Sequence, residues 1–469
     1  MKKNKIFTFE NIVFLIYFFV IALLAFNHEF SRDEFQVWTM VKELNTFEII
    51  KQMQYEGHPC LWHLIINLFA ELGFSYNIME VISCTFALLG VWIFLHKSPF
   101  NKIAKLLTCF NITFLMFASV FARSYSLLLF LIMCLASIYE RRKERPILYS
   151  IILALLVNTH VLICGLIGML ILKDLYEIFI MKEVYNKKNR IIGIAIVFVS
   201  ILLLILQLYK CFQFRNHVMV NSFLISNLLF QIFDTLVKYF IFQTNYYIFA
   251  LVSVLLLGIL LYLLKKEKSY IFLIFSGSLL FKILVHIYIY DLYYQQSSLI
   301  ILDLIFCLWC FSINKSNKIL NILFIIIISL TLPRSFYVSY LELTKDYSDA
   351  YDTAVYIKNN INEENKILCL EDNYCTPVIG YLDDYNYTFI SLYTKKEFSF
   401  IEWNVNFENY EYTEKELLDL IKEENIDYVI SNDGEIDVFK YNDNYEVEYK
   451  TDTSNVIFDE VYTIYGVQD

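Results

Sequence analysis

The stretch NHEFSRDEFQ at residues 27–36 decides how this sequence is organised. It directly follows the apolar run 12–26 and leads, through EGHP at residues 56–59, into a second apolar run at 61–69. If the first run crosses a membrane, the acidic side chains that follow it lie at the membrane surface. A partly desolvated carboxylate is suited to act as a general base or a metal ligand. The segment 27–63 is therefore the first place where chemistry is expected.

Composition predicts a membrane protein with two different halves. Hydrophobic residues make up 58% of the 469 residues, and apolar runs recur at about 20 residues, the length that crosses a bilayer. Residues 336–469 carry 30 acidic and 9 basic side chains, whereas the rest of the chain has a net charge of +11. We expect a multi-span membrane domain at 1–335 and an acidic soluble domain at 336–469, with no nucleic-acid partner, because an acidic surface repels an anionic polymer.

Basic clusters predict the orientation, because Lys and Arg in short loops stay on the cytoplasmic side. Placing all six clusters inside gives about 11 spans, a cytoplasmic N-terminus and an extracytoplasmic C-terminal domain, as in a multi-pass plasma-membrane protein. The clusters are Lys2/Lys3/Lys5, Lys97/Lys102/Lys105, Arg141/Arg142/Lys143/Arg145, Lys182/Lys187/Lys188/Arg190, Lys265/Lys266/Lys268 and Lys315/Lys318. The predicted spans are 9–27, 78–95, 103–121, 124–140, 146–160, 161–181, 190–210, 244–264, 269–289, 295–313 and 317–334.

This topology concentrates the polar residues on the outer face. The first span resembles a signal peptide, but no convincing small-residue cleavage site follows it, so we interpret it as an uncleaved span. The run 61–72 is too short to cross and is expected to lie on the outer surface. The outer-face loop is then 27–76, and the longest later outer segment is 211–243.

The Asp33-Glu34 pair is the main candidate for chemistry. It lies just beyond the first span, and the aromatic residues Phe35 and Trp38 that follow could lay a short helix on the membrane. The pair would supply a general base or hold a divalent cation such as Mg or Mn. The alternative is an ordinary solvated pair of loop acids.

His58-Pro59 is a more specific signal, because proline in a first turn starts a helix and leaves His58 just before it. A zinc site of His58, Cys60 and His63 is disfavoured, since the two histidines lie about 140° apart on a helix. In the soluble half, Cys369 and Cys375 are close enough in sequence for a disulfide, although the pattern supports one only weakly.

Cationic and polar residues at other outer turns could bind an anion. Arg123 and Tyr125 lie in one turn, His160 ends another, and Lys210 and Arg215 bring positive charge to the start of the segment 211–243. A planar guanidinium suits phosphate, whereas a lone Arg at an interface can also simply reach the headgroups. At His160 the alternative is a hydrogen bond that ends the helix.

The order of these motifs resembles the GT-C superfamily of membrane glycosyltransferases, which includes the protein O-mannosyltransferases and aminoarabinose transferases. The resemblance rests on Asp33-Glu34, the helix start His58-Pro59-Cys60-Leu61, the turn Arg123-Ser124-Tyr125 and Thr159-His160. Two positions differ from the family pattern. Cys60 stands where a second proline is common, and the segment around Gln296 offers no late arginine.

The resemblance implies transfer of a sugar from a polyprenyl-phosphate carrier to a glycan, lipid or protein acceptor on the outer face. Asp33 would be the general base, with Glu34 orienting it or sharing a divalent cation. The substrate-binding residues would be His58, Arg123, Tyr125, His160, Lys210, Arg215 and Gln296, of which Arg123 would stabilise the phosphate leaving group.

Two other function classes remain open. A lipid-linked glycan polymerase or ligase would also work on the outer face, but more arginine would be expected in its large outer loop. A non-catalytic lipid or glycan transporter usually has spans broken by Gly or Pro, and no proline interrupts a predicted span here. Lys282 and Asp303 are the main charged residues expected at the membrane midplane.

The acidic half is expected to be a small α/β domain that covers the active-site mouth, meets the acceptor or stabilises the protein as a cap. Alternating patterns predict its elements in chain order. They are a helix at 349–360, strands at 366–370 and 387–392, a helix at 414–424, and strands at 426–431, 445–449 and 461–467.

Overall fold

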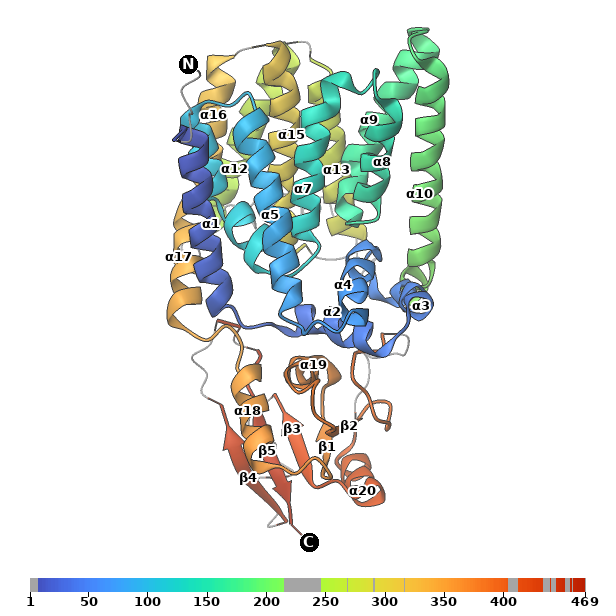
Figure 1. The fold of residues 1–469 in the computed structure, drawn as a ribbon, viewed down its shortest axis with the longest axis vertical. Coiled ribbons are helices and arrows are strands. Elements are labelled where there is room, and N and C mark those ends of the chain that lie inside the picture. The colour runs from blue at the N-terminus through green and yellow to red at the C-terminus, as the bar shows by residue number, and fades with distance from the viewer. Residues whose placement is uncertain are drawn as a thin grey trace. The chain divides into compact units, whose positions relative to one another are not determined.

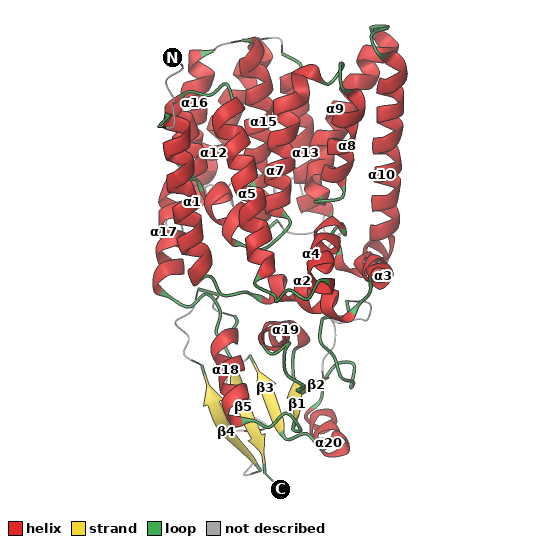
Figure 2. Cartoon of the chain, viewed as in Figure 1, coloured by secondary structure: helices red, strands yellow, loops and turns green. Residues whose placement is uncertain are grey.

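The structure is a computed structural model that describes residues 7–214, 246–267, 269–289, 292–315, 317–403, 412–432, 439, 444–451, 456–457 and 459–468. Most of these residues are helical, and a small sheet lies near the C-terminus (Figures 1 and 2). The chain forms two compact units. The helical unit comprises Met1–Ala25, Gly57–Trp62 and Glu80–Ser339, and the α/β unit comprises Phe26–Glu56, His63–Met79 and Tyr340–Asp469. The predicted outer-loop residues 27–56 thus group with the C-terminal residues.

The helical unit is built mainly from apolar helices. Among the described residues, six helices are long and apolar enough to cross a membrane, or seven if a bent pair counts as one span. The number of crossings expected from the sequence, about 11, stays a prediction. The elements are α1 (Phe9–Asn27), α5 (Ile78–Lys97), α6 (Lys102–Cys109), η1 (Thr113–Val120), α7 (Tyr125–Ile138), η2 (Tyr139–Arg141), α8 (Pro146–Val157), η3 (Val161–Ile163), α9 (Cys164–Leu175), η4 (Tyr176–Ile180), α10 (Lys187–Phe214), α12 (Tyr246–Lys266), α13 (Ile271–Tyr288), α14 (Tyr294–Ser297), α15 (Leu299–Asn314), α16 (Lys318–Ser329) and α17 (Leu332–Thr344), whose last residues, from Tyr340, belong to the α/β unit.

Burial separates the central helix of this unit from the peripheral ones. The apolar window that contains α15 is 83% buried, whereas the windows of α1 and α10 are 28% buried. Apolar surface left exposed over such lengths is typical of helices that face lipid. The helical unit therefore fits a bilayer environment.

The predicted span at 103–121 is broken into α6 and η1, which meet at a bend of 43°. The buried side chain of Asn111 explains the break, because its Oδ1 accepts the Phe114 N–H at 3.1 Å and so starts a new helix. Several neighbouring helices are also shorter than predicted. α8 has 12 residues, which corresponds to a length of only about 18 Å.

The α/β unit contains a five-stranded sheet of order β2-β1-β3-β5-β4. β1 pairs in parallel with β2 and β3, while β5 pairs antiparallel with β3 and β4. The five predicted strands are confirmed, as are the helices predicted at 349–360 and 414–424; α19 was not predicted. The elements are α2 (Arg32–Glu43), α3 (Thr46–Glu56), α4 (Leu61–Glu71), which begins in the helical unit, α18 (Ala350–Asn360), β1 (Lys366–Cys369), α19 (Asp372–Tyr381), β2 (Thr388–Ser391), α20 (Glu414–Glu424), β3 (Tyr428–Ser431), β4 (Tyr445–Lys450) and β5 (Thr463–Val467).

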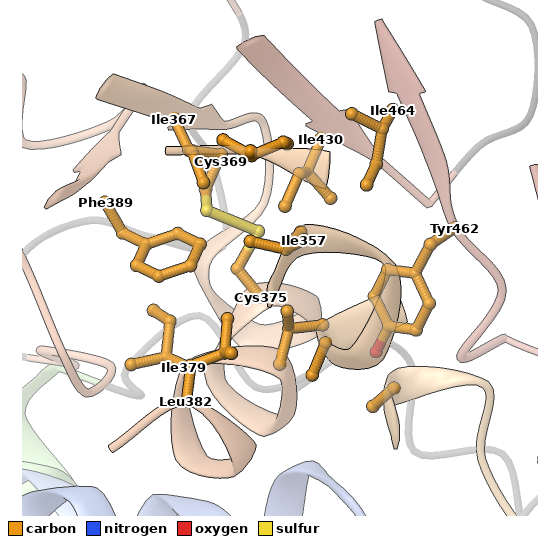
Figure 3. Close-up of a cluster of buried hydrophobic side chains, with 14 residues drawn as sticks. Ile357, Ile367, Cys369, Cys375, Ile379, Leu382, Phe389, Ile430, Tyr462 and Ile464 are labelled. Carbon is orange, nitrogen blue, oxygen red and sulfur yellow. A yellow bond between two sulfur atoms is a disulfide. The ribbon is translucent and has the colours of Figure 1, made fainter. Parts of the chain in front are cut away.

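Apolar clusters lie on both faces of the sheet. α18 and α19 bury one face through residues such as Ile357 and Val378, shown in part in Figure 3. α20 covers the other face with Leu417 and Leu420. The disulfide Cys369–Cys375, left open by the sequence, is present and joins β1 to the first turns of α19 with a Cα–Cα distance of 6.2 Å.

Candidate functional site

Helix α2 begins with a reciprocal hydrogen-bonding arrangement in the SRDEFQ stretch. Both the N–H and the hydroxyl of Ser31 donate to Glu34 Oε2, at 2.9 Å each. This is the capping-box arrangement, in which the third helical residue reaches back to the residue before the helix. Asp33, one position earlier, is exposed, whereas Glu34 is buried. The two acids that the sequence treated as a pair therefore have different environments.

Glu34 is also part of a buried charge cluster centred on His28. His28 Nδ1 lies 2.7 Å from Glu342 Oε1, and Nε2 lies 3.2 Å from both carboxylate oxygens of Glu34. Burial disfavours the charged imidazole, but the negative charges of Glu34 and Glu342 outweigh burial and raise the pKa of His28 well above its ordinary value. With a carboxylate near each ring nitrogen, the protonated imidazole is the form that this site favours. Sequence reasoning missed both His28 and Glu342.

The Glu34 carboxylate is therefore used in hydrogen bonds to Ser31 at the start of α2 and in its contact with His28. Among the described residues, no group of three or more His, Cys, Asp or Glu side chains is arranged to hold a metal ion. The divalent cation expected at Asp33 and Glu34 stays a prediction. The same finding gives no support to the zinc reading of His58, Cys60 and His63.

Arg32, the residue before Asp33, contacts residues near the C-terminus. Its backbone N–H donates to Glu460 Oε1 at 3.1 Å, and its guanidinium lies 3.2 Å from Asp459 and over the ring of Tyr374. Glu460 is fully buried and also accepts a hydrogen bond from the Ser348 hydroxyl at 2.5 Å. None of these C-terminal partners was identified from the sequence, because nothing local links them to Arg32.

Glu460 gives the α/β unit a predictable response to pH. Burial raises its pKa from the ordinary 4.5 to about 7, against hydrogen bonds from Ser348 and Arg32 that lower it. Between pH 4.5 and about 7 the folded chain keeps a proton at Glu460 that the unfolded chain has released, so stability falls as pH rises through this window. Glu460→Gln should remove this contribution and raise the free energy of unfolding at pH 8 by up to about 3 kcal/mol.

Urea unfolding of the full chain at pH 4 and pH 8, followed by hydrogen exchange of the β3 and β5 amides, measures this effect. The exposed residue Glu423 supplies the control variant Glu423→Gln. A native chain and a Glu460→Gln variant with the same pH dependence would contradict the assignment.

A second polar cluster lies within the helical unit around His160. This side chain is 2% exposed, and its Nδ1 accepts the Leu162 N–H at 3.2 Å. A neutral imidazole that accepts at Nδ1 carries its proton on Nε2. His160 Nε2 is buried and has no hydrogen-bond partner among the described residues. The cluster therefore offers a buried N–H donor.

Aromatic and cationic side chains surround that donor. Tyr125 stacks on the imidazole of His160 with ring centroids 5.4 Å apart, and the His58 ring lies 6.2 Å from it. Arg123 lies over the Tyr125 ring at 5.6 Å and donates to Gln295 Oε1 at 3.0 Å. Four residues predicted to bind substrate, His58, Arg123, Tyr125 and His160, are thus neighbours in the folded helical unit.

Backbone contacts hold His58 in this cluster. The Cys60 N–H donates to Gln207 on α10 at 3.2 Å, and the Leu61 N–H donates to the Asn158 carbonyl at 3.3 Å. Both donors lie at the start of α4, where the first-turn N–H groups of a helix have no intrahelical partners. The His-Pro signal therefore places a helix start against two other segments of the helical unit.

The other predicted binding residues have different positions. Gln296 accepts the Tyr293 N–H through Oε1 at 3.0 Å, whereas its neighbour Gln295 contacts Arg123. Lys210 is half-buried on α10. Arg215 lies outside the described residues. Lys282 of α13 and Asp303 of α15 form a buried ion pair, which also includes the hydroxyl of Ser278.

Comparison with known proteins adds no family assignment. No protein-family model matches this chain, and no curated protein matches it either.

Proposed function

We propose that this chain is an integral membrane glycosyltransferase that moves a sugar from a polyprenyl-phosphate donor to an acceptor on the outer face of the membrane, with Asp33 as general base. The observation that carries the proposal is the polar cluster around His160. It combines an unused imidazole N–H with the guanidinium of Arg123 in a unit otherwise built from apolar helices.

The chemistry of this cluster supports an oxyanion ligand. Arg123 and the Nε2–H of His160 are both hydrogen-bond donors, and a guanidinium fork matches the oxygens of a phosphate. Charge-assisted hydrogen bonds strengthen in a low-dielectric surrounding. A phosphate attached to a polyprenyl chain would also use the apolar helix surfaces, which soluble phosphate esters would not need.

The transfer step uses an attacking hydroxyl and a departing phosphate. The acceptor oxygen forms a bond to the anomeric carbon of the sugar while the bond from that carbon to the phosphate oxygen breaks. The hydroxyl proton goes to the carboxylate of Asp33, and the electron pair of the broken bond stays on the phosphate. Arg123 stabilises that leaving group, with His58 and His160 as further donors.

Two features support an extracytoplasmic location for the acidic domain. The basic clusters favour a cytoplasmic N-terminus, and the disulfide Cys369–Cys375 suits an oxidising compartment. Polyprenyl-linked sugars on the outer leaflet would supply the donor there, away from the cytoplasmic nucleotide pool.

The proposal predicts that Arg123→Gln lowers sugar transfer by about 100-fold, because the variant loses the charge that stabilises the phosphate. Arg123→Lys should retain part of the activity, since it keeps the charge but loses the planar fork. The assay measures transfer from a radiolabelled polyprenyl-phosphate donor pool in membranes that contain equal amounts of each chain.

The exposed residue Arg141 provides the matched control Arg141→Gln, which should transfer at the native rate. Membranes without the chain set the background. No transfer above background by the native chain would overturn the proposed function. If Arg123→Gln and Arg141→Gln transfer sugar equally well, the proposed enzyme activity stands, but Arg123 does not stabilise the phosphate.

A further inference from the structure

Helix α2 packs on α19 through a close aromatic contact within the α/β unit. Phe35 is 0% exposed, and a Cβ added at Gly380 would lie 1.9 Å from its Cδ1 atom. The ring of Tyr381 lies 4.5 Å from that of Phe35, and its hydroxyl accepts the Phe30 N–H at 2.7 Å. Only glycine at position 380 leaves room for this ring.

Polar contacts to the C-terminal residues continue along the same helix. The Gln36 side-chain amide donates to the Ile401 carbonyl at 3.0 Å and accepts the Ile401 N–H at 2.9 Å. The Trp38 indole N–H donates to Asp383 at 2.6 Å. Because Gln36 pairs with both the N–H and the carbonyl of Ile401, it fixes the rotation of α2 as well as the distance between α2 and Ile401.

The exposure along α2 is uneven in a way that matters for chemistry. Residues 34–41 are all buried and Arg32 is half-buried, whereas Asp33 is exposed. Arg32 is held by Glu460 and Asp459, and Glu34 is held by Ser31 and His28. The exposed carboxylate of Asp33 is therefore flanked by two residues that the rest of the unit holds in place.

We propose that the C-terminal α/β residues act as a positioning domain for Asp33, with Gly380, Phe35 and Gln36 as its positioning residues. This inference rests on the proposed function and assigns a role to the domain within it. The folded domain holds the Asp33 carboxylate in one orientation. Proton transfer then does not require a loop to become ordered at each turnover.

Gly380→Ala tests the inference in full-length chain in native membranes. The added methyl group displaces Phe35 and tilts α2, and we expect kcat for sugar transfer to fall roughly 10- to 100-fold with little change in the KM for the donor. Hydrogen exchange of the α2 amides should become faster. Gly466→Ala is the matched control, because the atoms nearest to its added Cβ belong to the exposed, flexible side chain of Glu448.

A second-site variant separates positioning from general damage. Phe35→Ala removes the ring atoms that the new methyl group would strike, so the double variant Phe35→Ala/Gly380→Ala should be more active than the product of the two single effects predicts. Gln36→Met serves if Gly380→Ala fails to fold, since it keeps the side-chain volume and loses both bonds to Ile401. It should show the same fall in kcat.

The outcomes distinguish the two proposals. No transfer by the native chain would overturn the proposed function, and the exchange measurement would still report whether the domain holds α2. If the native chain transfers sugar and Gly380→Ala or Gln36→Met has the same kcat as Gly466→Ala, the positioning role is overturned. This holds even if hydrogen exchange of the α2 amides becomes faster in the variant.

Discussion

Asp33→Asn is expected to lower sugar transfer by roughly 10²- to 10⁴-fold, the range that a positioned general base contributes. Asparagine has nearly the same size as aspartate but cannot accept the hydroxyl proton. Because Asp33 is exposed at the start of α2, its replacement should leave the fold intact. The measurement is transfer from the radiolabelled polyprenyl-phosphate donor pool at matched protein levels.

The same helix supplies a control for this prediction. Glu43 is an exposed acid in the last turn of α2, and Glu43→Gln should transfer sugar at the native rate. If Asp33→Asn also does so, Asp33 is not the base. If both variants lose activity together, the effect comes from the charge of the helix and not from a proton acceptor at position 33.

Glu34 shows why the sequence could not assign separate roles to the two neighbouring acids. Its carboxylate caps the start of α2 and contacts His28. The pattern Ser31-x-x-Glu34 before a helix carries a local signal for that role. The contact between His28 and Glu342 carries none, since 314 residues separate them.

Local patterns predicted the C-terminal sheet well and the membrane helices less completely. Strand alternation and the capping residue Thr413 mark elements that depend on neighbours in sequence. The break at Asn111 depends on a buried side chain that accepts the backbone N–H of Phe114. The surrounding apolar run is long enough for one span, so hydropathy does not reveal the break. The 11 spans expected from the sequence stay a prediction; among the described residues, six helices, or seven with the bent pair, are long and apolar enough to cross.

The surroundings of Arg123 show that the sequence could not distinguish between two adjacent residues. The sequence indicated Gln296 as a substrate-binding residue, which stays a prediction; in the structure its neighbour Gln295 accepts from Arg123, whereas Gln296 accepts the Tyr293 N–H. Adjacent residues on a helix point about 100° apart, so only one of them can face Arg123. Choosing between them requires the rotation of the helix, which packing of the whole unit determines.

His28→Leu is the substitution with the largest expected cost in stability. His28 lies between Glu34 and Glu342, and the side chains of all three residues are 0–2% exposed. Removing the cation leaves two carboxylates buried near each other without compensation, and breaking a buried ion pair in this way costs about 3–5 kcal/mol. Urea unfolding of the purified chain, followed by hydrogen exchange of α2 and α17, measures the loss.

The pH dependence of this effect has a defined sign. Burial opposes the charge on His28, but Glu34 and Glu342 raise its pKa well above the ordinary 6.5. Protonation of His28 in the folded chain therefore contributes stability in full below pH 6.5, and this contribution is lost as pH rises from 6.5 through the folded pKa. The His28→Leu variant should lack this decline above pH 6.5, and the difference between the two chains should shrink as pH rises.

Two further variants identify the charge as the cause. His96→Leu removes an exposed histidine and should change stability little. The triple variant His28→Gln/Glu34→Gln/Glu342→Gln replaces the whole cluster with neutral side chains of similar size, so it should recover much of what His28→Leu loses. If the triple variant is as unstable as His28→Leu, the loss comes from packing around the imidazole ring, including its contact with Tyr347 at 4.7 Å, and not from uncompensated charge.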